Sequence, residues 1–298
     1  MAAWGPFIRE RFPAAATTLL VGLMALASAG VAAEVAGGPV VFWPVIPVAT
    51  VAIVGAFFVL RVFDEHKDFD RDREAHPNRV LSRGLITLAD LARAGVGVAV
   101  VSLGLSAWLG LHAALWMVAA LVFATLMRFE FFIGDWLRDH IIVYAVTHNP
   151  VVALLMMVPV AGALGTTVFA EPIVHWLVIA SLTTLALEVG RKFRAPGDER
   201  PTQDTYTQAL GIKQATTLYI VIVGLVLAVM TVTVGVAKPY MIAVDFAAAG
   251  AAGAALSFAR SPTAGGAKQV ELATALLVLL SYGVLIGDLI ARRGFAWS

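Results

Sequence analysis

Long apolar stretches separated by short breaks constrain the fold of this chain more than any other feature. Each stretch has roughly 17 to 25 residues, which is enough for a helix to cross the ~30 Å hydrocarbon core of a bilayer. Hydrophobic residues make up 60% of the 298 positions and charged residues 14%, whereas soluble chains carry about 25% charged residues. We predict nine membrane-spanning helices, near residues 14–33, 40–63, 88–108, 111–127, 141–165, 172–189, 214–235, 239–258 and 269–291.

These spans leave no room for a soluble domain. We therefore predict an all-α fold, a single polytopic membrane bundle over residues 1–298, with two polar cytoplasmic loops over a central cavity. The segment 128–148 is open to two interpretations: a short interfacial helix between spans four and five, which we favour, or a bent extension of span four. The first span also resembles a cleavable signal sequence, but its length favours a retained helix.

The distribution of basic residues predicts the orientation in the membrane. Of the 21 Lys and Arg residues, all but Lys238, Arg292 and Arg293 fall in the N-terminus or in connections on the same side as it. Because cytoplasmic loops carry the Lys and Arg excess, we expect the N-terminus and the connections at 64–87 and 190–213 in the cytoplasm. The expected location is the cell (plasma) membrane, with the C-terminus outside. Arg292 and Arg293 go against the rule.

Two further compositional features exclude some classes of function. The formal net charge of +1 makes no case for a nucleic-acid partner. The chain has no cysteine, which excludes disulfides, thiolate metal sites and a cysteine nucleophile. The sequence predicts no particular oligomeric state.

Acidic side chains recur in the connection at 64–87. Asp64, Asp68 and Asp72 are spaced at i, i+4 and i+8, so on a helix the three carboxylates share one face. Like charges in this arrangement repel unless a cation lies between them. We therefore predict Mg²⁺ there, held by these carboxylates and completed by phosphate oxygens and water.

Basic side chains in the same connection are candidates for binding a phosphate group. Arg79 and Arg83 lie in a turn that suits an anion, and Lys67 lies between two of the aspartates. The alternative is a solvated interfacial loop whose acidic and basic side chains simply pair with one another.

The whole string resembles the first aspartate-rich motif of the UbiA superfamily of intramembrane prenyltransferases, NDxxDxxxD followed by Pro-x-Arg-Pro-Leu-x-x-Gly. Asp64 takes the Asn position of that motif, and Val80 stands where the family has proline. Neither departure removes a metal ligand. The matching residues are Glu65, Asp68, Asp72, Pro77, Arg79, Leu81 and Gly84.

The connection after the sixth span resembles a degenerate second acidic motif of the same superfamily. Glu188 and Glu199 keep carboxylates, but Lys192 and Ala195 stand where aspartates are expected. The resemblance implies that Glu188 is a further metal ligand and that Arg191 and Lys192 contact the diphosphate. An i, i+4 salt bridge between Glu188 and Lys192 is the alternative.

The resemblance implies transfer of a prenyl group from a prenyl diphosphate to an aromatic or lipid acceptor, with Mg²⁺ as cofactor and the lipid bilayer as surroundings. Asp64, Asp68 and Asp72 are then the catalytic residues. Three alternatives remain: cyclisation of the same donor, transfer of a phosphoribosyl group to a lipid phosphate, and transport of a cation without catalysis. His148, near the start of span five, is a lone histidine, and such residues are more often helix-end or interface residues than bases.

Overall fold

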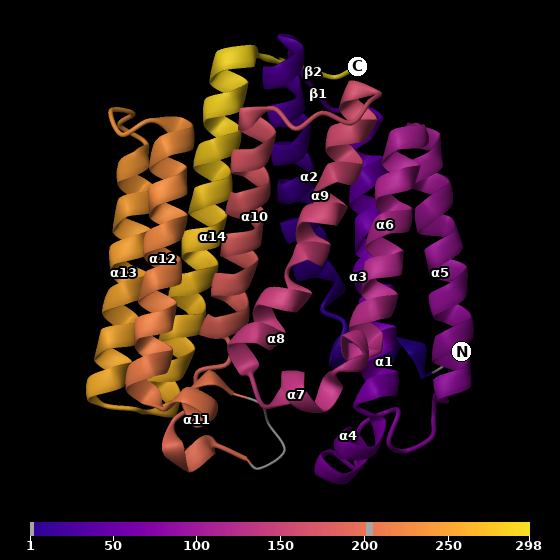
Figure 1. The fold of residues 1–298 in the computed structure, drawn as a ribbon, viewed down its shortest axis with the longest axis vertical. Helices are drawn as coiled ribbons and strands as arrows, with labels where there is room; N and C mark the ends of the chain where they lie inside the picture. The colour runs from indigo at the N-terminus through magenta and orange to yellow at the C-terminus, as the bar shows by residue number, and fades with distance from the viewer. Residues whose placement is uncertain (1–2, 201–204) are drawn as a thin grey trace.

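The computed structural model describes residues 3–200 and 205–298, and helices form nearly all of it (Figure 1). In chain order the elements are α1 (Trp4–Arg11), α2 (Ala14–Ala36), β1 (Val40–Val41), α3 (Val45–Lys67), α4 (Phe69–Ala75), α5 (Leu88–Leu109), α6 (Leu111–Arg128), the 3₁₀ turn η1 (Glu130–Phe132), α7 (Gly134–Arg138), α8 (Ile141–His148), α9 (Pro150–Leu164), α10 (Glu171–Gly190), η2 (Pro196–Asp198), α11 (Tyr206–Leu210), α12 (Ile212–Val234), α13 (Met241–Arg260), α14 (Ala264–Arg293) and β2 (Phe295–Ala296).

The described residues contain nine segments that are long and apolar enough to cross a membrane, which confirms the predicted bundle. The boundaries differ most from the prediction at the starts of two spans. The second span begins at Val45 rather than near 40, because residues 40–41 form strand β1 and pair in parallel with β2. The last span begins at Ala264, where the Thr263 hydroxyl accepts a hydrogen bond from the Gly266 amide and caps a helix of 30 residues.

The segment between spans four and five contains the short helix α7, as the favoured interpretation predicted. Span five then consists of two helices, α8 and α9, which meet at Asn149 and Pro150. Proline has no amide hydrogen to continue the hydrogen-bond ladder and is favoured at the first position of a new helix. The side-chain amide of Asn149, the residue before this proline, donates a hydrogen bond to the Ser181 carbonyl of α10 at 3.1 Å.

Polar side chains join the helices inside the bundle. The Trp176 indole on α10 donates to the Ser28 hydroxyl on α2 at 2.8 Å, and the Trp176 side chain is fully buried. The hydroxyl groups of Thr183 and Tyr282 lie 2.6 Å apart between α10 and α14. Such interhelical hydrogen bonds help to fix helix pairs that otherwise pack only apolar surface.

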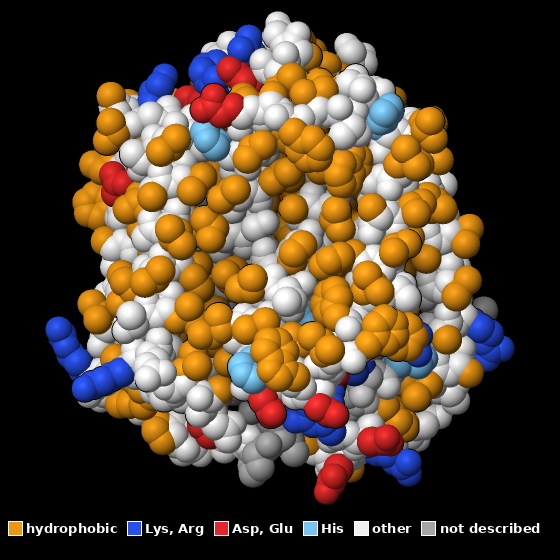
Figure 2. Space-filling view, viewed as in Figure 1, with side chains coloured by type: hydrophobic (Ala, Val, Ile, Leu, Met, Phe, Trp, Pro, Cys, Tyr) orange, Lys and Arg blue, Asp and Glu red, His pale blue; other side chains and the backbone are white. Residues whose placement is uncertain are grey.

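The C-terminus lies at one end of the bundle, and the first helix, α1, lies toward the other end (Figure 1). We call the end that carries α1, α4, α7 and α11 the polar end. On the face shown in Figure 2, apolar side chains cover most of the middle of the bundle, and charged side chains gather mainly toward its two ends.

The far end explains the two arginines that oppose the charge rule. Arg292 and Arg293 each lie 2.7 Å from the Glu34 carboxylate, and Arg292 also lies 2.8 Å from the buried Asp288. These arginines therefore join α14 to α2 by ion pairs.

Candidate functional site

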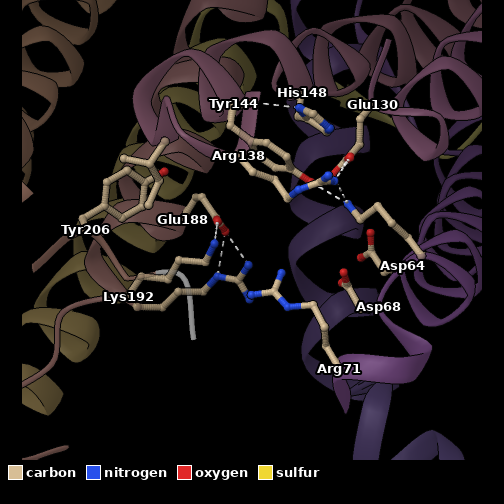
Figure 3. Close-up of a pocket in the computed structure, with 13 residues that line it drawn as sticks. Asp64, Asp68, Arg71, Glu130, Arg138, Tyr144, His148, Glu188, Lys192 and Tyr206 are labelled. Atoms are coloured by element: carbon tan, nitrogen blue, oxygen red, sulfur yellow. Dashed lines mark hydrogen bonds and ion pairs between the residues drawn. The ribbon is translucent and has the colours of Figure 1, made fainter. Parts of the chain in front are cut away.

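A cavity of about 370 Å³ opens among the charged connections at the polar end. We call it the polar-end cavity. It contains side chains from both charged connections and from the segment between spans four and five (Figure 3). Its lining residues are Asp64, Lys67, Asp68, Arg71, Glu130, Arg138, Ile141, Tyr144, His148, Glu188, Arg191, Lys192 and Tyr206.

Two of the predicted acidic residues lie on one side of this cavity. Asp64 is in the last turn of α3, and Asp68 ends that helix with its amide bonded to the Asp64 carbonyl at 2.9 Å. Burial raises the pKa of the Asp68 carboxyl, the neighbouring Lys67 opposes that rise, and the negative charge of Asp64 adds to it. A cation beside these two carboxylates would relieve their repulsion.

The structure does not bring Asp72 to this cavity, although the spacing predicted that it shares a face with Asp64 and Asp68. The backbone leaves regular helical geometry at Asp68 (φ −99°, ψ 8°), and α4 starts afresh at the next residue. The Asp72 carboxylate lies 2.7 Å from the Arg11 guanidinium of α1 and 2.8 Å from that of Arg79. Asp72 therefore belongs to an ion-pair network beside the cavity.

Two residues that we predicted to bind a phosphate group, Arg79 and Arg83, also lie outside the cavity. Arg79 is bound to Asp72, and Arg83 is exposed; neither lines the polar-end cavity. Arg11 also contacts Glu65, at 2.5 Å, and only 3% of the Glu65 side chain is exposed. Of the three basic residues in the first connection that we predicted to bind a phosphate group, Lys67, Arg79 and Arg83, only Lys67 lines the cavity.

The opposite side of the cavity comes from the end of α10 and from α11. The Lys192 ammonium lies 2.7 Å from the Glu188 carboxylate, and the Arg191 guanidinium also pairs with it. Burial alone would lower the pKa of Arg191, but the charge of Glu188, the hydrogen bond to Glu188 and the nearby charge of Asp64 together raise this pKa. Lys192 also lies 6.0 Å from the ring centre of Tyr206. Arg191 and Lys192, the two residues of this connection that we predicted to contact a diphosphate, therefore line the cavity and pair with Glu188.

A third side comes from the segment between spans four and five, which carried no recognised motif. Glu130 is buried and pairs with Arg138, while Lys67 donates to the Tyr144 hydroxyl at 2.5 Å. Three successive residues from Glu130 have positive φ angles of 48°, 53° and 62°. Such angles are uncommon outside glycine, and they turn the chain sharply beside the cavity. Glu130 and Arg138 are site residues that sequence reasoning missed, and no local spacing marked them.

The carboxylates at the cavity are of the kind that binds Mg²⁺. Magnesium binds through one or two carboxylates together with phosphate oxygens and water. Asp64 and Asp68 supply two such groups at the cavity. The pKa of Asp68 is raised chiefly by burial, with the negative charge of Asp64 adding to the rise. Among the residues that the structure describes, no group of three or more acidic or histidine side chains forms a metal site by itself. A metal ion held here would take its remaining ligands from phosphate oxygens or water.

Comparison with known proteins places the fold. No protein-family model matches the chain, and no curated protein matches it either. A structure of digeranylgeranylglyceryl phosphate synthase is 14% identical, with a TM-score of 0.68 over 98% of this chain and 100% of that one. A UbiA homologue from Aeropyrum pernix K1, in its apo form, is 15% identical, with a TM-score of 0.63 over 91% of this chain and 96% of that one.

A third similar structure contains ligands. It is a UbiA homologue from Archaeoglobus fulgidus bound to DMAPP and Mg²⁺, 13% identical, with a TM-score of 0.55 over 94% of this chain and 99% of that one. All three alignments span more than nine tenths of each chain. The chain therefore has the fold of the UbiA homologues, as the first charged connection predicted.

Proposed function

We propose that this chain is a Mg²⁺-dependent intramembrane prenyltransferase that moves a prenyl group from a prenyl diphosphate to a hydrophobic acceptor. The observation that carries the proposal is that one cavity has two carboxylates, Asp64 and Asp68, on one side and two cations on the other. These cations are Arg191 and Lys192. A diphosphate bound with a divalent ion needs both kinds of group. The homologue from Archaeoglobus fulgidus, which shares the fold, is bound to DMAPP and Mg²⁺.

The roles of the charged residues follow from the negative charge that develops as the diphosphate leaves. Mg²⁺ held by Asp64 and Asp68 would neutralise charge on the diphosphate oxygens. Arg191 offers a planar fork and Lys192 a point charge, and both would stabilise the negative charge that grows on the leaving group. Glu188 orients these two cations, as its contacts with both indicate. We therefore assign Glu188 to positioning and not to metal binding.

The prenyl carbon becomes positive as the diphosphate leaves. Ile141, Tyr144 and Tyr206 line the same cavity and supply apolar and aromatic surface. Aromatic faces attract a cation, and an apolar wall keeps water from capturing it. Lys67 donates to the Tyr144 hydroxyl at 2.5 Å, which fixes the position of that ring.

The test is incubation of membranes containing the chain with labelled prenyl diphosphates of several lengths and Mg²⁺, followed by analysis of lipids and diphosphate. We expect a labelled lipid adduct together with stoichiometric diphosphate. A cyclic product without a second substrate would indicate the cyclase alternative, and preference for a phosphoribosyl donor would indicate phosphoribosyl transfer. Metal flux without diphosphate release would contradict any transferase.

A further inference from the structure

His148 is the last residue of α8 and lies inside span five, on the wall of the polar-end cavity. Its ring stacks on Tyr144 with the ring centres 4.0 Å apart and meets the edge of Phe131 at 5.5 Å. These two contacts hold the ring in one plane. The proposed ionisation of the diphosphate does not use this residue.

The hydrogen bonds of His148 determine which ring nitrogen carries the proton. Its Nδ1 lies 2.7 Å from the Tyr144 carbonyl oxygen and 3.3 Å from the Thr147 hydroxyl. A carbonyl oxygen only accepts, so Nδ1 is the donor. The Thr147 hydroxyl donates its own hydrogen to the Val143 or Tyr144 carbonyl, at 2.8 and 3.0 Å. In the neutral ring the lone pair is therefore on Nε2.

The Nε2 atom has no hydrogen-bond partner among the residues that the structure describes, and it is buried. A buried acceptor without a partner costs free energy, which a ligand hydroxyl would recover by donating to it. In Figure 3 this nitrogen is on the side of the ring away from the Tyr144 hydrogen bond, toward Glu130 and Arg138. Nε2 therefore points toward two other residues that line the cavity.

The other bases on this wall are already engaged. Glu130 pairs with Arg138 and lies 3.9 Å from the Lys67 ammonium. The Tyr144 hydroxyl accepts from Lys67. Across the cavity, Glu188 is bound by two cations. The lone pair of His148 is thus the most available proton acceptor on this side of the cavity.

We propose that His148 Nε2 is the general base that takes the proton of the acceptor, and that the acceptor is an apolar molecule with a hydroxyl group. This inference rests on the proposed prenyl transfer. The acceptor oxygen forms a bond to the first prenyl carbon as the bond from that carbon to diphosphate breaks, and its electron pair leaves with diphosphate. The hydroxyl proton moves to Nε2, and the resulting imidazolium later returns it to water. An ether is the product.

The test compares two acceptors that differ in their need for a base, an octyl-substituted phenol and the corresponding aryl thiol. At about pH 8 the phenol keeps its proton, because phenols ionise near pH 10, whereas the aryl thiol is ionised. His148→Gln should lower kcat/KM for the phenol on the order of 10²-fold and for the thiol by less than about threefold.

His140→Gln is the matched control. Its Nδ1 also lies 2.7 Å from the carbonyl oxygen four residues earlier, and its ring stacks on Trp136, but it is exposed and does not line the cavity. Both acceptors should react at the wild-type rate in this variant. Equal losses with phenol and thiol in His148→Gln, or no loss with either, would overturn the assignment.

Two measurements separate failure of this assignment from failure of the proposed function. If the wild-type chain releases no diphosphate from any prenyl diphosphate, the prenyltransferase proposal fails and the base has no reaction to serve. If diphosphate is released but only water captures the prenyl group, the hydroxyl-acceptor assignment alone fails. NMR of isotope-labelled histidine should show a signal of an unprotonated Nε2 that is lost in His148→Gln and kept in His140→Gln; a protonated Nε2 on His148 would contradict its role as the base.

Discussion

At the scale of single residues, Asp68 has an unusual position. It ends α3 and lines the cavity, and the pKa of its carboxyl is raised by burial and by the nearby Asp64. An ordinary surface aspartate has no such need for a cation. Two residues on, Asp70 is exposed and does not line the cavity, so it offers a comparison within one segment.

Asp68→Asn should lower the prenyl-transfer rate by at least about 10²-fold, because a metal that stabilises the leaving group loses a charged ligand. Asp70→Asn removes the same charge from the same segment without touching the cavity and should keep nearly full activity. Steady-state assays with saturating Mg²⁺ measure both rates. Similar losses in the two variants would mean that net charge, and not a ligand, matters at this connection.

At the scale of elements, α1 and α4 are linked by Arg11. This arginine contacts Glu65 of α3 at 2.5 Å and Asp72 of α4 at 2.7 Å, across 61 residues of sequence in the second case. Arg61 lies farther from Glu65, at 3.7 Å. The position of α4 beside the cavity therefore depends on the N-terminal helix, and Asp72 acts in this arrangement as an anchor for α4.

Arg11→Ala leaves the buried Glu65 without its nearest cation, and removing one partner of a buried pair costs about 3 kcal/mol. We expect a lower Tm in detergent and a slower transfer rate as α4 loses its anchor. Arg9→Ala, on an exposed position of the same helix, is the control and should change neither. An unchanged Tm in Arg11→Ala would show that the network does not hold α4. In Tm and transfer rate, Asp72→Asn should resemble Arg11→Ala more than Asp68→Asn. If it resembles Asp68→Asn more, Asp72 is a metal ligand after all.

At the scale of the whole molecule, each connection lies at one end of the bundle or the other according to whether it follows an even-numbered or an odd-numbered span. The charged connections follow the second and sixth spans, so four spans separate them and both reach the polar end. The ninth span leaves the C-terminus at the opposite end from helix α1. We propose that the polar end faces the cytoplasm, as the Lys and Arg excess there favours.

Reporters inserted after Ala75 and after Arg200 should both read as cytoplasmic, and one fused after Ser298 should read as external. The physical reason is that translocating a loop rich in Lys and Arg is disfavoured. Paired reporters, one active only inside the cell and one only outside, measure each site. Opposite faces for positions 75 and 200 would contradict the bundle itself, whereas a common external face would reverse only the orientation.

The sequence alone determined the nine spans, because hydrocarbon requires long apolar helices and leaves few other solutions. It also predicted that Asp64, Asp68, Arg191 and Lys192 meet at one end, since these residues follow spans of the same parity. Tertiary structure decided what depends on distant partners and on exact backbone direction. A break at Asp68 turned Asp72 toward Arg11. The fold of the segment before span five brought Glu130 to the cavity, beside His148 of span five. Neither outcome follows from spacing, because each depends on contacts between residues far apart in the chain.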